Sequence, residues 1–176
     1  MKEKIISSKS IYEGRIVHLS VATVQLPNGQ QSTREIVKHP GAVAIVALTE
    51  SQQILMVKQF RLAANQVMLE LPAGTLEPDE DPLQCAIREL QEETGYKPGS
   101  IEPMGGVFVA PGYTTEFIHF FLATNLVESV LEMDDDEFIE LIAIDYQQVL
   151  AMIESHKIQD AKTIAAILKV AHKFGW

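Results

Sequence analysis

The sequence predicts a layered fold of helices and strands, of the α/β or α+β kind rather than a doubly wound sheet. Short runs rich in Val and Ile mix with amphipathic helical segments, without a strict strand–helix–strand alternation. The 176 residues include 47% hydrophobic and 22% charged residues, a composition that can bury a core and excludes intrinsic disorder. The length suits one ordinary domain, with at most a small appendage.

The charge balance limits the possible partners. A formal net charge of −10 argues against a nucleic acid or an anionic membrane as a partner. An anionic substrate would therefore need a local source of positive charge, such as a divalent cation. The single cysteine, Cys85, excludes an internal disulfide and a cysteine-based zinc cluster. The longest apolar run, Ala42 to Leu48, is far shorter than the roughly 20 residues of a membrane span, and no signal peptide is visible, so we expect a cytoplasmic protein.

The N-terminal part predicts a small antiparallel β unit. Two extended runs, Arg15–Leu26 and Ser32–Lys38, flank the turn signal Pro27-Asn28-Gly29, which is typical of a hairpin. His39-Pro40-Gly41 then interrupts the pattern. We therefore predict a hairpin unit over residues 1–39 and a main domain over residues 40–176.

The main domain predicts strands and helices in mixed order. Asp81 and Pro82 are favourable at the start of a helix, and Gly95 is favourable just beyond its end. An acidic run from Glu132 to Glu137 is interpreted as a solvated loop. The predicted strands are Ala42–Leu48, Gln53–Phe60, Val67–Leu71, Ile101–Val109, Glu116–Ala123 and Phe138–Ile144, and two further helices are predicted over Tyr146–Ser155 and Gln159–Phe174.

The helix over Leu83–Thr94 carries an unusual acidic face. Glu89 and Glu93 are four residues apart with Glu92 beside them, and Arg88 lies one turn before Glu92. Like charges at this spacing cost an isolated helix about 0.2–0.5 kcal/mol per pair. A solvated acidic face is one explanation. The other is a site for a hard cation, Mg²⁺ or Mn²⁺, because carboxylate oxygens are its preferred ligands.

A longer spacing pattern favours the second explanation. Gly74 is followed after five residues by Glu80, after seven more by Arg88-Glu89-Leu90, and then, with one residue between groups, by Glu92-Glu93 and Gly95-Tyr96. This pattern resembles the Nudix box, with every fixed position filled. The resemblance implies an α/β/α sandwich around a mixed β-sheet, here preceded by the small N-terminal antiparallel β unit.

The resemblance also implies roles for the motif residues. The metal ligands would be the carbonyl of Ala73 and the carboxylates of Glu89, Glu92 and Glu93, which together would hold two or three Mg²⁺ (or Mn²⁺) ions. Glu92 and Glu93 would be catalytic, together with the later Glu116 as a general base or an extra ligand. Arg88 would hold a glutamate in place. The remaining motif residues would be structural, namely Gly74, Glu80 and Gly95.

The flanking segments resemble the ADP-ribose pyrophosphatase branch of this family. They are Val57–Arg61, Leu69–Gly74 and Ala110–Glu116, the last of which places Pro111 16 residues after Gly95. The resemblance implies substrate contacts from Arg34, Arg61, Glu70 and Pro111, although a hydrogen-bonding role within the fold is equally open for Glu70. It also implies a homodimer, in which Arg34 would reach the partner's substrate.

We therefore expect Mg²⁺-dependent hydrolysis of ADP-ribose to AMP and ribose 5-phosphate, with attack by a metal-activated water. Three alternatives stay open. They are hydrolysis of another nucleoside diphosphate sugar, such as a GDP-hexose or UDP-sugar, hydrolysis of an oxidised nucleoside triphosphate, and binding of ADP-ribose without cleavage. The sequence does not distinguish the physiological substrate, the number and identity of the ions, or which glutamate is the general base.

Overall fold

The computed structural model describes residues 1–129 and 138–176, so the predicted acidic loop from Glu132 to Glu137 lies outside the described residues. The chain forms two compact units. The first contains Met1–Gly41 and Phe108–Phe117, and the second contains Ala42–Val107 and Ile118–Trp176. None of the helices in the described residues is both long and apolar enough to span a bilayer.

The first unit is built on a three-stranded antiparallel sheet. Its strands are β1 (Lys4–Glu13), β2 (His18–Gln25) and β3 (Gln31–Lys38), in the order β1-β2-β3. The β2–β3 hairpin confirms the predicted turn, in which Gly29 has a φ of 85° and donates its N–H to Leu26 at 2.9 Å. Strand β1 is not among the predicted strands, because every residue of this edge strand is exposed and its sequence lacks apolar alternation.

The second part of this unit is a loop between two strands of the chain's other unit. Its backbone is tied to the end of β3, since Val37 N–H donates to the carbonyl of Tyr113 at 2.7 Å and Thr115 N–H donates to that of Val37 at 3.0 Å. His39 N–H also donates to the Thr115 hydroxyl at 2.9 Å. These bonds fix the loop that carries Pro111 and Glu116.

The second unit contains two sheets. Their orders are β10-β5-β6 and β7-β4-β9-β8. The predicted mixed sheet is confirmed, because β4 pairs in parallel with β9 and antiparallel with β7. The strands are β4 (Ala42–Ala47), β5 (Gln53–Arg61), β6 (Gln66–Glu70), β7 (Ala73–Thr75), β8 (Tyr96–Phe108), β9 (Phe117–Glu128) and β10 (Glu140–Asp145).

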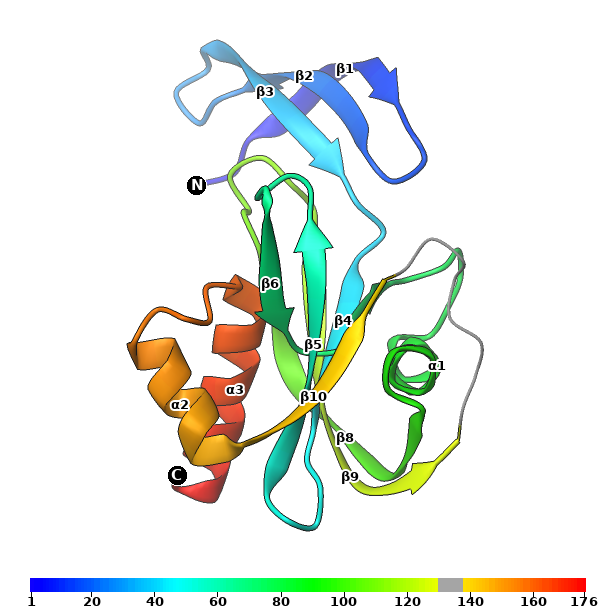
Figure 1. Ribbon diagram of the computed structural model, residues 1–176. Coiled ribbons are helices and arrows are strands. Elements are labelled where there is room, and N and C mark those ends of the chain that lie inside the picture. The colour runs from blue at the N-terminus through cyan, green and yellow to red at the C-terminus, as the bar shows by residue number, and fades with distance from the viewer. Residues whose placement is uncertain (130–137) are drawn as a thin grey trace. The chain divides into compact units, whose positions relative to one another are not determined.

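Helices cover the two faces of the sheets, as the predicted sandwich requires (Figure 1). The helices are α1 (Pro82–Thr94), α2 (Tyr146–Glu154) and α3 (Ala161–Phe174). Strand β4 is buried along its whole length and sends alternate side chains to opposite faces. Val43 and Ile45 pack with Leu90 of α1, whereas Ala44 and Val46 pack in the core that contains Ile167 of α3. Helix α1 therefore completes one apolar core, and α2 and α3 together complete the other.

Within the second unit, β9 continues to Glu128, beyond its predicted end at Ala123, and two further strands differ from the prediction. Strand β7 was not predicted, because it is only three residues long and contains Gly74. Strand β8 begins at Tyr96 rather than Ile101, and continues through Pro98 and Gly99, which are unfavourable in strand interiors. In both cases tertiary pairing overrides the local preference.

Candidate active site

Helix α1 begins and ends at the residues that the sequence predicts. The Asp81 side chain accepts hydrogen bonds from the backbone N–H groups of Leu83 and Gln84 at 3.0 and 3.4 Å, and Pro82 occupies the first turn. Gly95 takes the left-handed conformation with a φ of 73°, and its N–H donates to the carbonyl of Gln91 at 2.9 Å. These two caps fix the helical face on which the motif glutamates lie.

Arg88 is bonded to three carboxylates, and we call this group the α1 cluster: Glu80, Arg88, Glu89 and Glu92. Nη1 of Arg88 donates to Glu89 and Glu92, both at 2.8 Å, while Nε and Nη2 donate to Glu80 at 3.0 and 3.1 Å. The hydrogen bond from Arg88 lowers the pKa of Glu80 to about 2. Three carboxylates face one guanidinium, so the α1 cluster has a net negative charge.

Glu80 also fixes the loop that precedes the helix. One of its carboxylate oxygens accepts a hydrogen bond from the backbone N–H of Glu77 at 3.0 Å. The same side chain thus joins the loop to Arg88.

Gly74 and Glu93 connect the helix to strand β7. The buried Glu93 accepts a hydrogen bond from the backbone N–H of Ala73 at 2.9 Å. A Cβ atom at position 74 would lie only 1.8 Å from the carboxyl carbon of Glu89, so a side chain there would displace that carboxylate. The backbone of β7 and the glutamates of α1 therefore lie in direct contact.

The residues present fit a hard divalent cation. Glu89, Glu92 and Glu93 supply only oxygen donors, and the carbonyl of Ala73 belongs to the residue that Glu93 contacts. Among the described residues, no three Asp, Glu, His or Cys side chains are already grouped as a metal site. Arg88 donates to both Glu89 and Glu92, so an ion bound here would share these two carboxylates with the guanidinium.

Cys85 lies beside the α1 cluster but has no reactive character. We expect from the sequence a small helix residue with no basic group nearby, yet Arg88 donates to its sulfur at 3.4 Å. Burial nevertheless raises the pKa of the Cys85 thiol, and hydrogen bonding to Glu80 raises it further. The thiol therefore stays protonated.

A second charged group, which we call the Glu70 cluster, consists of Arg61, Glu70, Asp160 and Lys162. Glu70 is only 1% exposed, and its carboxylate accepts hydrogen bonds from Arg61 at 2.9 and 2.8 Å and one from Lys162. Burial opposes the ionisation of Glu70, but the hydrogen bond from Arg61 and the charge of Lys162 outweigh it and lower its pKa. This geometry favours the hydrogen-bonding role within the fold that the sequence leaves open for Glu70.

Lys162 is not among the site residues predicted from the sequence. A signal for it exists, because a lysine in the first turn of a helix opposes the helix dipole and so indicates a specific partner.

Arg61 also lies close enough to Glu93 for that carboxylate to contribute to its raised pKa, after the larger contribution of the hydrogen bond to Glu70.

The remaining predicted residues, Arg34, Pro111 and Glu116, belong to the first unit. Arg34 lies on β3, where its guanidinium pairs with Glu3 at 2.6 Å. Their roles at the site stay predictions.

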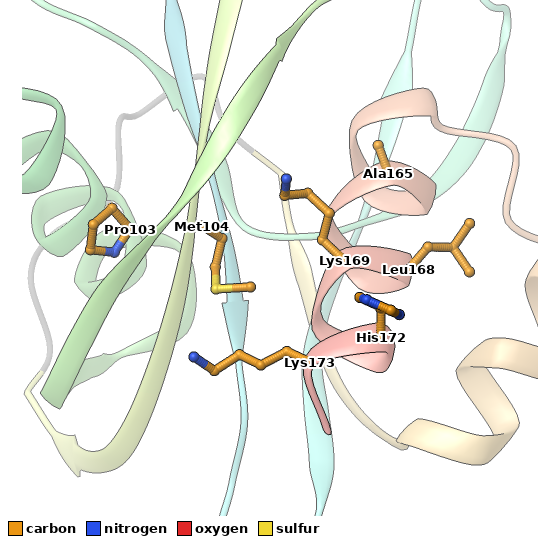
Figure 2. A pocket seen from close by; sticks show the side chains of 7 residues that line it. All are labelled: Pro103, Met104, Ala165, Leu168, Lys169, His172 and Lys173. Carbon is orange, nitrogen blue, oxygen red and sulfur yellow. The ribbon is translucent and has the colours of Figure 1, made fainter. Parts of the chain in front are cut away.

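A separate cleft of about 740 Å³ lies between α3 and β8 (Figure 2). None of the predicted site residues lines it, and α3 packs in the core opposite that of α1. We therefore place the candidate active site at α1 and β7, and not in this cleft. The lining residues are Pro103, Met104, Ala165, Leu168, Lys169, His172 and Lys173.

Comparison with known proteins gives family matches along the chain. Residues 38–167 match the model of the NUDIX domain, and residues 3–37 match that of the nucleoside diphosphate sugar hydrolase N-terminal domain. An ADP-ribose pyrophosphatase of Bacillus subtilis is 44% identical over 95% of this chain and 91% of its own length. A methanol dehydrogenase activator of Bacillus methanolicus is also 44% identical, over 94% and 91% respectively. A GDP-mannose pyrophosphatase of Yersinia enterocolitica is 33% identical over 76% and 75%.

A solved structure has the same fold. The crystal structure of an ADP compounds hydrolase superposes with a TM-score of 0.88 at 19% identity, and the match covers 99% of this chain and 95% of that one. The predicted sandwich with its N-terminal β unit is thereby confirmed.

Proposed function

The chain belongs to the Nudix family, and from that premise we propose that it hydrolyses the pyrophosphate of ADP-ribose to AMP and ribose 5-phosphate. The observation that supports the site of this reaction is the excess of carboxylates around Arg88, next to a glycine whose missing side chain leaves room for Glu89. The ADP-ribose pyrophosphatase relative, at 44% identity, supports the substrate.

Under this proposal, one set of residues binds the metal ions and another contacts the substrate. We propose that Glu89, Glu92, Glu93 and the Ala73 carbonyl hold two or three ions, Mg²⁺ or Mn²⁺. When bound, such an ion neutralises phosphate oxygens and lowers the pKa of a bound water. Arg61, whose side chain is 41% exposed, contacts the phosphates or the ribose.

The general base is one of three glutamates. We propose Glu116 for this role, with Glu92 and Glu93 as the alternatives. A pH–rate profile of Glu116→Gln tests this choice, because loss of the base removes the acidic limb of the profile.

Product analysis tests the proposal. The purified chain is incubated with Mg²⁺ and, separately, with ADP-ribose, GDP-mannose, a UDP-hexose and an oxidised nucleoside triphosphate. We expect AMP and ribose 5-phosphate from ADP-ribose at the highest kcat/KM. Faster cleavage of another compound would move the assignment to that substrate, and binding of ADP-ribose without products would indicate a sensor.

A second candidate function is suggested by the methanol dehydrogenase activator, which matches as well as the pyrophosphatase. This second function would be activation of a methanol dehydrogenase. It is tested by adding the chain to a purified methanol dehydrogenase, and a higher rate of that enzyme would support it. The same addition with Glu93→Gln shows whether activation depends on the hydrolase site.

We also propose a homodimer formed through the first unit. Strand β1 is an edge strand that exposes four large apolar or aromatic side chains, Ile5, Ile6, Ile11 and Tyr12, each at least 50% exposed. An exposed apolar edge of this kind is typical of a pairing surface. Light scattering tests the proposal, and a monomer would also remove the role of Arg34 in a partner's site.

A further inference from the structure

Glu70 holds Arg61 in one orientation. Its Oε1 accepts from Nε of Arg61 at 2.9 Å and its Oε2 accepts from Nη2 at 2.8 Å. A two-bond contact of this kind fixes the plane of the guanidinium. No hydrogen bond among the described residues uses Nη1 of Arg61, and 41% of its side chain is exposed. The outer edge of the guanidinium is therefore available to an anionic ligand.

Lys162 binds the same carboxylate from the α3 side. Its Nζ donates to Oε2 of Glu70 and lies 3.0 Å from a carboxylate oxygen of Asp160, and its side chain is only 13% exposed. The last torsion of a glutamate has a broad preference, so the carboxylate plane is weakly fixed by the side chain itself. The bond from Lys162 fixes that plane, and with it the orientation of Arg61.

The position of Lys162 is unfavourable for helix α3 alone. It lies two residues after the N-cap, Asp160, and the N-terminal end of a helix carries partial positive charge. The neighbouring Thr163 ties the same turn to the residue that follows β6, since its hydroxyl donates to Asp160 at 2.6 Å and accepts from the backbone N–H of Leu71 at 2.9 Å. The first turn of α3 is therefore built to reach the end of β6.

We infer that Lys162 is a positioning residue, which acts through Glu70 to present Arg61 to the phosphates of the substrate. The inference rests on the proposed function, in which Arg61 contacts the substrate. Lys162 shares the negative charge of Glu70. Without Lys162, the charge of the Glu70 carboxylate is balanced by Arg61 alone, and Arg61 then attracts an anionic substrate less strongly.

The first test is the kinetics of Lys162→Met, which removes the charge but keeps the length of the side chain. We expect KM for ADP-ribose to rise about tenfold with kcat within about twofold of the wild type. Lys162→Arg keeps the charge and is expected to restore most of the affinity. The matched control is Lys169→Met on the same helix, which removes a lysine outside the Glu70 cluster and is expected to leave KM unchanged.

A double variant separates positioning from a general effect on the fold. In an Arg61→Ala background, Lys162→Met is expected to raise KM by less than about twofold, because the residue through which it acts is gone. A full tenfold rise in that background, or no rise in the single variant, would overturn the inference.

A measurement without substrate separates this inference from the proposed function. The exchange of the Arg61 Nε–H with water is followed by NMR, with Arg61→Lys to assign the signal. We expect exchange at least about fivefold faster in Lys162→Met, because the bond to Glu70 is held less firmly. An unchanged rate overturns the inference whatever the kinetics show. If the wild type does not cleave ADP-ribose, the proposed function fails, and the exchange rate still decides the role of Lys162.

Discussion

The α1 cluster and the Glu70 cluster combine carboxylates and cations in different proportions. In the α1 cluster three carboxylates surround one guanidinium, and the side chains of Arg88 and Glu92 are 28% and 26% exposed. In the Glu70 cluster two cations face two carboxylates, Glu70 is buried, and the most exposed side chain is that of Arg61. The first cluster therefore presents negative charge and the second presents a cation.

This difference suits the two ends of a metal–pyrophosphate ligand. An excess of carboxylates suits a divalent cation. In the balanced cluster, the exposed guanidinium of Arg61 can contact a phosphate while it stays paired with Glu70. It also explains how a chain with a net charge of −10 can bind an anion. Under the proposed function, the positive charge would be supplied locally, by an ion held at α1 and by Arg61.

The largest effect is expected from Glu93→Gln, which tests whether the α1 side of the comparison holds metal. We expect turnover of ADP-ribose to fall by about 10³-fold, which corresponds to roughly 4 kcal/mol of lost transition-state stabilisation. The fold should survive, because the Gln carbonyl can still accept the hydrogen bond from Ala73. Kinetics at several Mg²⁺ concentrations measure the effect.

The control for this variant is Glu140→Gln, which alters an exposed glutamate whose ion pair is a surface contact to Lys58. Mg²⁺ should raise the melting temperature of the control and of the wild type more than that of Glu93→Gln. Near-normal activity of Glu93→Gln at saturating Mg²⁺ would remove the metal role from Glu93.

The next effect is expected from Gly74→Ala. The added Cβ meets the flexible end of Glu89 rather than the backbone, so the carboxylate must move while the fold is kept. We expect kcat/KM to fall by about 30- to 100-fold with little change in melting temperature. If Glu89 carries the effect, adding Gly74→Ala to Glu89→Ala should change the activity little further. A large loss of stability would show that the glycine serves the backbone instead.

The sequence predicts the two clusters to different extents, because their bonded residues are separated by different lengths of chain. The α1 cluster lies within 13 residues, from Glu80 to Glu92, and the caps Asp81 and Gly95 mark its helix, so a local spacing pattern, through the family resemblance that it carries, indicates these residues together. The bond between Lys162 and Glu70 joins residues 92 positions apart, which no local pattern indicates. Strand β1 was missed for a related reason, because an exposed edge strand needs no apolar alternation.

A smaller effect, on stability, is expected from Arg88→Met. The variant leaves Glu80, Glu89 and Glu92 without their shared cation, so their repulsion and lost hydrogen bonds should lower the free energy of unfolding by about 2–3 kcal/mol. Urea denaturation at neutral pH measures this. Mg²⁺ should restore part of the loss, because a divalent cation can replace the missing charge. A variant as stable as the wild type would mean that the carboxylates are too well solvated to need Arg88.

The smallest effect at neutral pH, and the most specific test of the α1 cluster, is the acid dependence that Glu80 contributes. Its pKa is about 2 in the folded chain, against an ordinary value of 4.5, because Arg88 favours its charged form. The stabilisation is therefore complete above pH 4.5 and is lost as the pH falls from 4.5 to 2. In Glu80→Gln, which has no proton to bind, the urea midpoint should fall less steeply between pH 5 and pH 3. Glu70 has a lowered pKa too, so part of the slope should persist in that variant. Equal slopes in the two proteins would show that the bonds between Glu80 and Arg88 add no stability, and the α1 cluster would then owe its arrangement to the helix alone.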